Sequence, residues 1–208
     1  MLHRILTSLV LICGLAVPAL SRADVEPDDL ARNTTNEVIK IVTADKDMKK
    51  GNNKKVYDLV QAKVLPHFDF MQMTKLAVAT NWKLASSAQQ AALVEQFQAL
   101  LVRTYAASIS SVADYKIEYK PLRLKPGETD VTVSSEVSKP GAPPIPIDYR
   151  MEKQGKEWKV YDVLVDNVSL VTVYRKSFAS EVKRGGIDGL IQTLAKRNQS
   201  NQAGEAKT

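Results

Sequence analysis

The residue types that most often carry out catalysis or bind metals are scarce in this chain of 208 residues. It contains one cysteine, Cys13, and two histidines, His3 and His67. A serine or cysteine nucleophile needs a neighbouring base, and His67, between Pro and Phe, reads as a packed or surface histidine. No G-x-S-x-G, H-E-x-x-H, C-x-x-C or EF-hand motif occurs. Asp162 and Asp166 remain a candidate carboxylate pair, although most such acids are solvated or cap helices. The sequence therefore predicts no enzyme, no catalytic residue and no metal site.

The first 23 residues have the organisation of a cleavable signal peptide. A basic start precedes an apolar run from Ile5 to Val17, and Ser21-Arg22-Ala23 places small residues where a signal peptidase cuts. Cys13 lies inside the apolar run, so we do not expect a lipid anchor. Cleavage after Ala23 leaves 185 residues without cysteine, and it lowers the formal charge from +6 to +4 because two arginines and no acid are lost. We expect export to a bacterial periplasm or an extracellular space, with a fold stabilised by core burial rather than disulfides.

After the signal peptide, the chain is predicted to begin with helices. Apolar residues recur at helical spacing over Leu30–Ile41 and over Val56–Val64, and Asp69 is a candidate cap for a third helix. The fourth helix has the strongest signal. It starts with a capping-box pattern, offered by both Ser86–Gln89 and Ser87–Gln90, and is predicted to end near Ser108.

From Asp114 the apolar residues alternate with polar ones, which indicates strands. Lys125-Pro126-Gly127, Lys139-Pro140-Gly141 and Gln154-Gly155 are turn sequences between the alternating segments. Three consecutive hairpins predict an antiparallel sheet of about four strands.

The chain is predicted to end in helices. Ser169 is a candidate cap, Gly185-Gly186 is a stop signal, and Asp188 begins a last helix. We expect residues 24–197 to form a single α+β domain, with helices packed on one face of a curved sheet. Residues 198–208 have no apolar pattern and are predicted to be a flexible tail.

The positive charge of the chain does not indicate nucleic-acid binding. After cleavage the excess is small, and no basic stretch is interleaved with aromatic residues. Five lysines gather between Lys46 and Lys55. We interpret them as a solvated turn, with electrostatic steering towards anionic headgroups or an acidic partner as the alternative.

Two parts of the chain contain short motifs whose order and spacing, from about Asp28 to Lys196, are specific. Those in the first part are Leu65-Pro66-His67-Phe68-Asp69-Phe70, Asn81-Trp82-Lys83-Leu84-Ala85, Gln89-Gln90, Phe97 and Leu101-Val102-Arg103-Thr104-Tyr105. Those in the second part are Trp158-Lys159-Val160-Tyr161-Asp162-Val163, Val168-Ser169-Leu170, Tyr174-Arg175, Phe178, Gly186-Ile187-Asp188-Gly189-Leu190 and Leu194. Each motif is weak alone, but together they resemble the MlaC family, also called the toluene-tolerance auxiliary family.

The resemblance implies a periplasmic phospholipid carrier with a mixed fold related to the NTF2-like cone. Such a carrier moves glycerophospholipid between an outer-membrane lipoprotein–porin complex and an inner-membrane ABC transporter with an MCE-domain subunit, which maintains outer-membrane lipid asymmetry. It implies no cofactor besides the phospholipid cargo, and a shuttle is most simply a monomer. One departure is visible: the family often has glycine shortly before Trp82, where Ala79 or Thr80 stands here. This difference is expected to affect the local backbone or the pocket mouth.

A carrier of this kind buries acyl chains in an apolar pocket and leaves the headgroup exposed. In the strands, the alternation of apolar and polar residues assigns the side chains that line the pocket. A shift of one residue in strand register would move all of a strand's predicted lining residues to the other face of the sheet. The predicted lining residues are Leu101, Tyr105, Tyr119, Val131, Val133, Ile147, Tyr149, Val163, Val165, Leu170, Val171 and Tyr174. Arg175 is a candidate phosphate contact at the mouth, and an ordinary salt bridge is the alternative.

Two other functions remain open at this point. One is a periplasmic adaptor or chaperone-like module whose apolar positions form only a core. The other is a small hydrolase on an NTF2-like scaffold, which would need a polar pocket floor with a buried Asp–His pair.

Overall fold

The computed structural model describes residues 25–111 and 114–205. The predicted signal peptide and Cys13 lie outside these residues. The N-terminal half is helical: α1 (Pro27–Ala44), α2 (Lys46–Lys49), α3 (Asn53–Lys63), η1 (Leu65–His67), α4 (Phe70–Val78), η2 (Ala79–Leu84) and α5 (Ser87–Ser110). The strands are β1 (Lys116–Tyr119), β2 (Asp130–Ser138), β3 (Ile145–Gln154), β4 (Glu157–Val165) and β5 (Val168–Ser169), and α6 (Thr172–Glu205) follows them. The predicted order of helices, antiparallel sheet and helices is confirmed.

Two helix starts follow from side chains that satisfy free backbone N–H groups. The Asp69 carboxylate accepts a hydrogen bond from the Gln72 N–H at 2.8 Å, which begins α4. The Ser86 hydroxyl accepts from the Gln89 N–H, and the Gln89 side chain accepts from the Ser86 N–H at 3.0 Å. Both caps are as the sequence predicts.

The sheet has the strand order β1-β2-β3-β4-β5, and all neighbours are antiparallel. The register of β3 on β4 shifts between Arg150 and Met151. Met151 therefore pairs with Val160 and Tyr149 pairs with Val163, so these four residues share one face despite the irregularity. The fifth strand, which has two residues, is added to the four that the turns predicted.

The C-terminal segment differs from the prediction at its end. Ser169 lies in β5, and its hydroxyl accepts a hydrogen bond from the N–H of Thr172, the first residue of α6, at 3.0 Å, so it caps this helix as predicted. Gly186 (φ 68°, ψ −170°) breaks the helical geometry, as its sequence predicts. The helix then continues to Glu205 in place of the expected tail, and Asn198 is buried where its amide donates to the Gln96 carbonyl at 2.9 Å. This contact with α5 orders residues that have no apolar pattern of their own.

Ala79 ends α4 with φ 54° and ψ −130°. Side chains with a Cβ avoid this region, whereas glycine enters it readily. Ala79, one of the two positions at which the resemblance led us to expect glycine, therefore has a strained backbone conformation in this chain.

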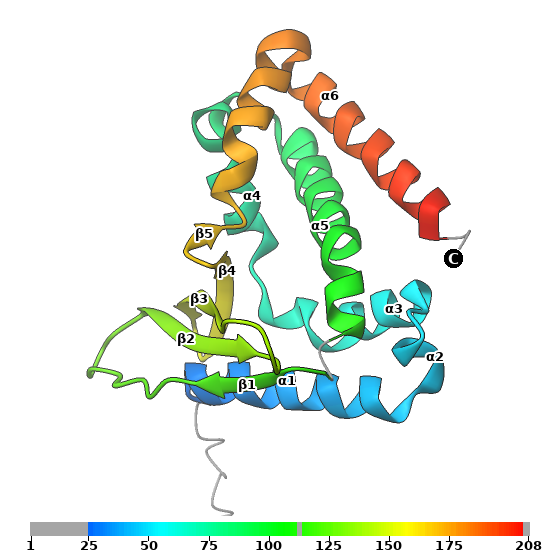
Figure 1. The fold of residues 1–208 in the computed structure, drawn as a ribbon. Helices are drawn as coiled ribbons and strands as arrows, with labels where there is room; N and C mark the ends of the chain where they lie inside the picture. Colours follow the sequence, from blue (N-terminus) through cyan, green and yellow to red (C-terminus); the bar gives the residue numbers. More distant parts are fainter. Residues whose placement is uncertain (1–24, 112–113, 206–208) are drawn as a thin grey trace, which may run out of the picture.

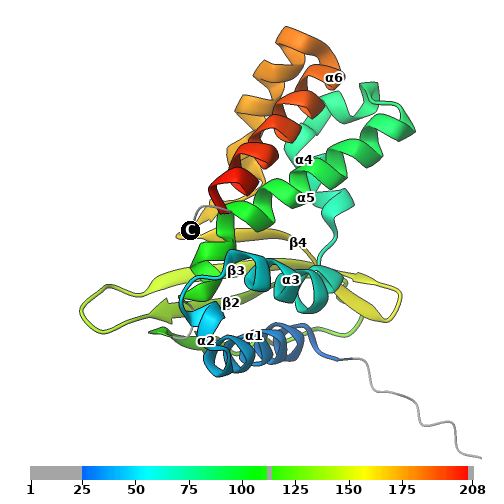
Figure 2. The ribbon, with the colours of Figure 1, turned by 90° about the vertical axis from the view of Figure 1, so that its right-hand side faces the viewer.

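The buried apolar residues form separate clusters that divide the molecule (Figure 1). One cluster packs α4, η2, α5 and α6 into an arm that projects away from the sheet. A second joins α1, α2 and α3 to Val102 of α5. The third packs one face of the sheet against the first turns of α1 and Phe68. Figure 2 shows α1 beneath the sheet and the arm on the opposite side of it. Every helix among the described residues is too short or too polar to span a bilayer.

Candidate functional site

An apolar cavity of about 250 Å³ lies between α1 and the sheet. Helix α1 forms one wall, the end of α3 with η1 and Phe68 forms the second, and the strands form the third. Ile109, in the last turn of α5, completes the lining. The lining residues are Leu30, Ala31, Thr34, Thr35, Val38, Val64, His67, Phe68, Ile109, Ile117, Val137, Tyr149, Met151 and Val160.

Regular spacing places these side chains on the cavity. Leu30, Thr34 and Val38 are four residues apart, so they lie above one another on a single face of α1. Phe68 is held against the sheet by a bridge to Val160, whose carbonyl accepts from the Asp69 N–H at 2.9 Å. The helix and the strands thus present apolar surfaces to each other across the cavity.

Tyr119 fastens α1 to the edge strand β1. Its hydroxyl lies 2.6 Å from the Thr35 hydroxyl and donates to the Ala31 carbonyl at 3.1 Å. The Arg32 guanidinium lies over the Tyr119 ring, 5.1 Å from its centre. Burial raises the pKa of Tyr119, and burial also raises the pKa of neighbouring Tyr149. Both phenols therefore stay neutral at physiological pH, and the wall formed by α1 is held by neutral hydrogen bonds.

The polar groups of the lining are few. Thr34, Thr35 and Tyr149 contribute hydroxyls, and His67 contributes the one imidazole. Burial lowers the pKa of His67, and the nearby Lys159 ammonium lowers it further. No group of three or more His, Cys, Asp or Glu residues in the described part of the chain is arranged to hold a metal ion. Such a lining suits non-directional burial of an apolar chain rather than activation of a nucleophile.

The structure gathers the predicted sheet residues around this cavity. Tyr149 lines it directly. The others belong to the buried cluster that supports the lining residues Met151 and Val160. These supporting residues are Tyr119, Val131, Val133, Ile147, Val163, Val165 and Leu170. Their role in lipid binding stays a prediction.

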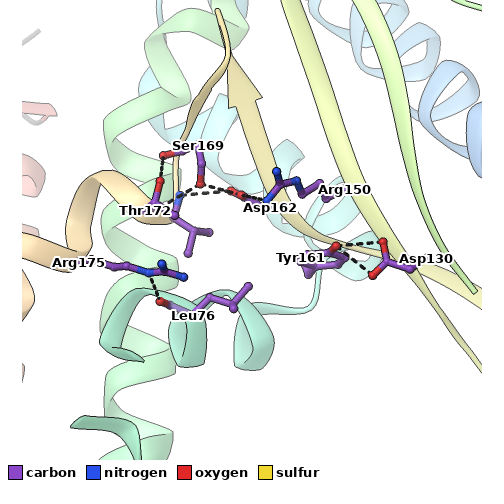
Figure 3. Close-up of polar contacts among 9 residues, drawn as sticks. Leu76, Asp130, Arg150, Tyr161, Asp162, Ser169, Thr172 and Arg175 are labelled. Carbon is purple, nitrogen blue, oxygen red and sulfur yellow. Dashed lines mark hydrogen bonds and ion pairs between the residues drawn. The ribbon is translucent and has the colours of Figure 1, made fainter. Parts of the chain in front are cut away.

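The predicted residues from the helices lie elsewhere. Leu101, Tyr105, Val171 and Tyr174 pack in the cluster of the α4–α6 arm, and none of them lines the cavity. An α-helix rises about 1.5 Å per residue, so the 24 residues of α5 extend beyond one core. Arg175 donates from Nε to the Leu76 carbonyl at 2.8 Å, which joins α6 to α4 (Figure 3).

The largest group that sequence reasoning missed comes from α1. The helical spacing of Leu30, Thr34 and Val38 was visible, but alternation within strands gave no information about which helix faces them. Ile117 and Met151 were also missed, although each lies two residues from a predicted lining residue of the same strand, Tyr119 or Tyr149. Residues two apart in a strand point to the same face of the sheet, so the alternation would have identified both.

Asp162 makes contacts that stabilise the fold. It is 2% exposed, and it accepts hydrogen bonds from the Ser169 hydroxyl at 2.7 Å and the Val171 N–H at 3.3 Å (Figure 3). The Arg150 guanidinium lies 3.7 Å away. Asp162 therefore ties β4 to the junction of β5 and α6, while Asp166 lies in the tight turn before β5 with φ 50°.

The basic segment between Lys46 and Lys55 is partly neutralised. Lys55 pairs with Asp45 at 2.9 Å and with Asp47 at 2.7 Å, and Lys54 pairs with Asp58. These pairs favour the interpretation as a solvated turn.

Comparisons with known proteins agree with this geometry. The MlaC protein family model matches residues 32–196. Toluene tolerance protein ttg2D of Pseudomonas putida is 26% identical over 206 residues, which cover 96% of this chain and 95% of that protein. The intermembrane phospholipid transport system binding protein MlaC of Haemophilus influenzae is 21% identical over 175 residues, which cover 83% of this chain and 82% of that protein. A phospholipid-binding protein from Ralstonia solanacearum, solved in complex with a phospholipid, is 36% identical with a TM-score of 0.78, covering 86% of this chain and 99% of that chain.

Proposed function

The chain belongs to the MlaC family, and we propose that it is a periplasmic phospholipid carrier whose acyl chains enter the cavity between α1 and the sheet. One observation carries this proposal. The cavity is lined mainly by apolar side chains, and it lies in a fold shared with a protein solved in complex with a phospholipid.

The physical chemistry of the cargo explains why a protein is needed. Moving about 28 methylenes from water into an apolar site is worth about 22 kcal/mol at ~0.8 kcal/mol each. Lipid therefore has to pass from one apolar site to another through direct contact, not through water. A lining of leucine, valine, isoleucine and phenylalanine buries chains without directional demands, so variation in acyl chains is tolerated. The chemistry required is binding and release, which supports a non-catalytic role.

The carrier role implies a donor and an acceptor at the two membranes. We propose an inner-membrane ABC transporter with an MCE-domain subunit and an outer-membrane lipoprotein–porin complex as these partners, and maintenance of outer-membrane lipid asymmetry as the outcome. Export through cleavage after Ala23 would deliver the chain to the periplasm. A single chain per lipid is the simplest arrangement for a shuttle.

Native mass spectrometry of the protein purified from periplasmic extract without detergent tests the proposal. We expect a phospholipid adduct near one per chain, with extraction and identification of the lipid alongside. A homogeneous lipid-free protein, still empty after incubation with phospholipid vesicles, would contradict the carrier and favour an adaptor or chaperone-like module.

A further inference from the structure

A second hollow lies on the arm, between α5, the first turn of α6 and the C-terminal half of α6. Its volume is about 460 Å³, which is within the range of small-molecule sites. None of its lining residues contributes to the cavity beneath the sheet. We call it the arm groove, and its lining residues are Leu100, Thr104, Tyr174, Thr193, Lys196, Arg197, Ser200 and Asn201.

The charge of the arm groove is positive. Lys196 and Arg197 lie on its lining, and no carboxylate does. Neither cation forms an ion pair with any residue whose side chain the structure describes. The whole of α6 carries six lysine and arginine residues against three acidic residues. The groove therefore takes both of its cations from a helix that carries an excess of positive charge.

The hydroxyl groups around these cations are mostly used as donors within the protein. Thr104 donates to the Leu100 carbonyl at 2.7 Å, and Thr193 donates to Glu181 at 3.1 Å. Glu181 also accepts from Arg184, and this hydrogen bond is the main cause that lowers its pKa. Glu181 therefore already has hydrogen-bond partners, and the charge of Arg197 also contributes to lowering its pKa. The donors left for a ligand come chiefly from Lys196 and Arg197.

Tyr174 forms the aromatic part of the groove and is half-buried. Burial raises its pKa and Tyr105 adds to this, whereas the positive charge of Arg197 opposes it. The guanidinium thus lies close enough to the phenol to affect its ionisation. A lysine ammonium and a forked guanidinium at adjacent positions, beside a neutral phenol, are the donors that recognise a phosphate group.

We propose that the arm groove is a phosphate-binding site, separate from the acyl-chain cavity, in which Lys196 and Arg197 contact the phosphate oxygens. The phosphate is either free in solution or part of an anionic lipid headgroup. The proposal does not depend on the carrier function, because the two sites share no residue.

The test is a titration of the isotopically labelled protein with inorganic phosphate at low ionic strength, followed by NMR. The groove variant is Lys196→Gln with Arg197→Gln. The matched control, Lys176→Gln with Lys183→Gln, removes the same charge from exposed positions of the same helix outside the groove. We expect saturable shifts at Tyr174 and Thr193 in the wild type and the control, and affinity at least about tenfold weaker in the groove variant.

Two results would overturn the proposal: no saturable shift in the wild type, or equal weakening in both variants, which would indicate net charge alone. Flotation with phosphatidylglycerol and phosphatidylcholine vesicles identifies the source of the phosphate. Loss of phosphatidylglycerol binding in the groove variant alone supports a headgroup, and phosphate binding without vesicle binding supports a free phosphate. Lipid occupancy of the cavity, measured by native mass spectrometry, is expected to be unchanged in the groove variant.

Discussion

Removing the hydroxyl of Tyr119 tests how firmly α1 closes the cavity. In the Tyr119→Phe variant the ring stays in place, while the hydrogen bonds to the Thr35 hydroxyl at 2.6 Å and to the Ala31 carbonyl at 3.1 Å are lost. Each such bond contributes about 1 kcal/mol net in a partly buried site, so the free energy of unfolding should fall by about 2 kcal/mol. With a urea slope of about 2 kcal/mol/M, the midpoint of unfolding should fall by about 1 M.

The same change should speed the release of lipid. Because α1 forms one wall of the cavity, weakening its attachment to β1 lowers the cost of moving it away from the sheet. Release is measured by loading the protein with a fluorescent phospholipid and adding excess acceptor vesicles. We expect a higher release rate in Tyr119→Phe at an unchanged initial lipid stoichiometry.

Tyr161→Phe is the matched control. Its hydroxyl donates to the Asp130 carboxylate at 3.0 Å in a solvent-exposed position (Figure 3), and partial burial with this neighbour raises its pKa to about 12. Water replaces an exposed hydrogen bond, so the cost should stay below about 0.5 kcal/mol. If the two variants lose equal stability, or if lipid release is the same in both, the hydroxyl of Tyr119 does not fasten α1 and the reasoning is wrong.

Other predictions concern the cavity, the backbone and pH. Ala31→Phe places a ring in a cavity of about 250 Å³ and should reduce lipid occupancy in native mass spectra, whereas Ala91→Phe on the exposed face of α5 should not; equal occupancy in both would place the lipid elsewhere. Ala79→Gly relieves a positive φ and should raise the free energy of unfolding by about 0.5–1 kcal/mol after the entropy of glycine is subtracted. In the same denaturant assay Ala91→Gly should lower it by about 1 kcal/mol, and a loss at Ala79 as well would show that alanine is not strained there. Because the pKa of His67 is lowered in the folded state, the unfolded state binds the proton more readily, and stability should fall as pH drops below 6.5. His67→Gln should remove that part of the pH dependence in unfolding curves, and an unchanged profile would exclude His67 as its source.

Much of the secondary structure was predictable because its signals are local. The cap at Asp69, the capping box at Ser86 and the break at Gly186 depend on residues within one helical turn, and each is found in the structure. The hairpin turns fixed the antiparallel order in the same way. The end of α6 was not predictable locally, since the burial of Asn198 depends on Gln96 of α5.

The candidate site could be predicted only in part. Alternation placed Val131, Val133 and Tyr149 on the face that packs against α1, and this parity survives the irregularity at Arg150. The helical residues of the prediction, such as Leu101, share the same apolar character but pack in another cluster. Composition alone does not distinguish two cores that are built from the same residue types.

The sequence by itself determined the kind of protein. A leader-like start, scarce catalytic groups and motifs in family order predict an exported lipid carrier. Tertiary structure alone decided where the cavity lies, because it forms between α1 and strands that follow it by some 70 residues or more. Apolar burial is non-directional, so a sequence records which residues are apolar, while only the packing of distant elements decides which of them leave a space between them.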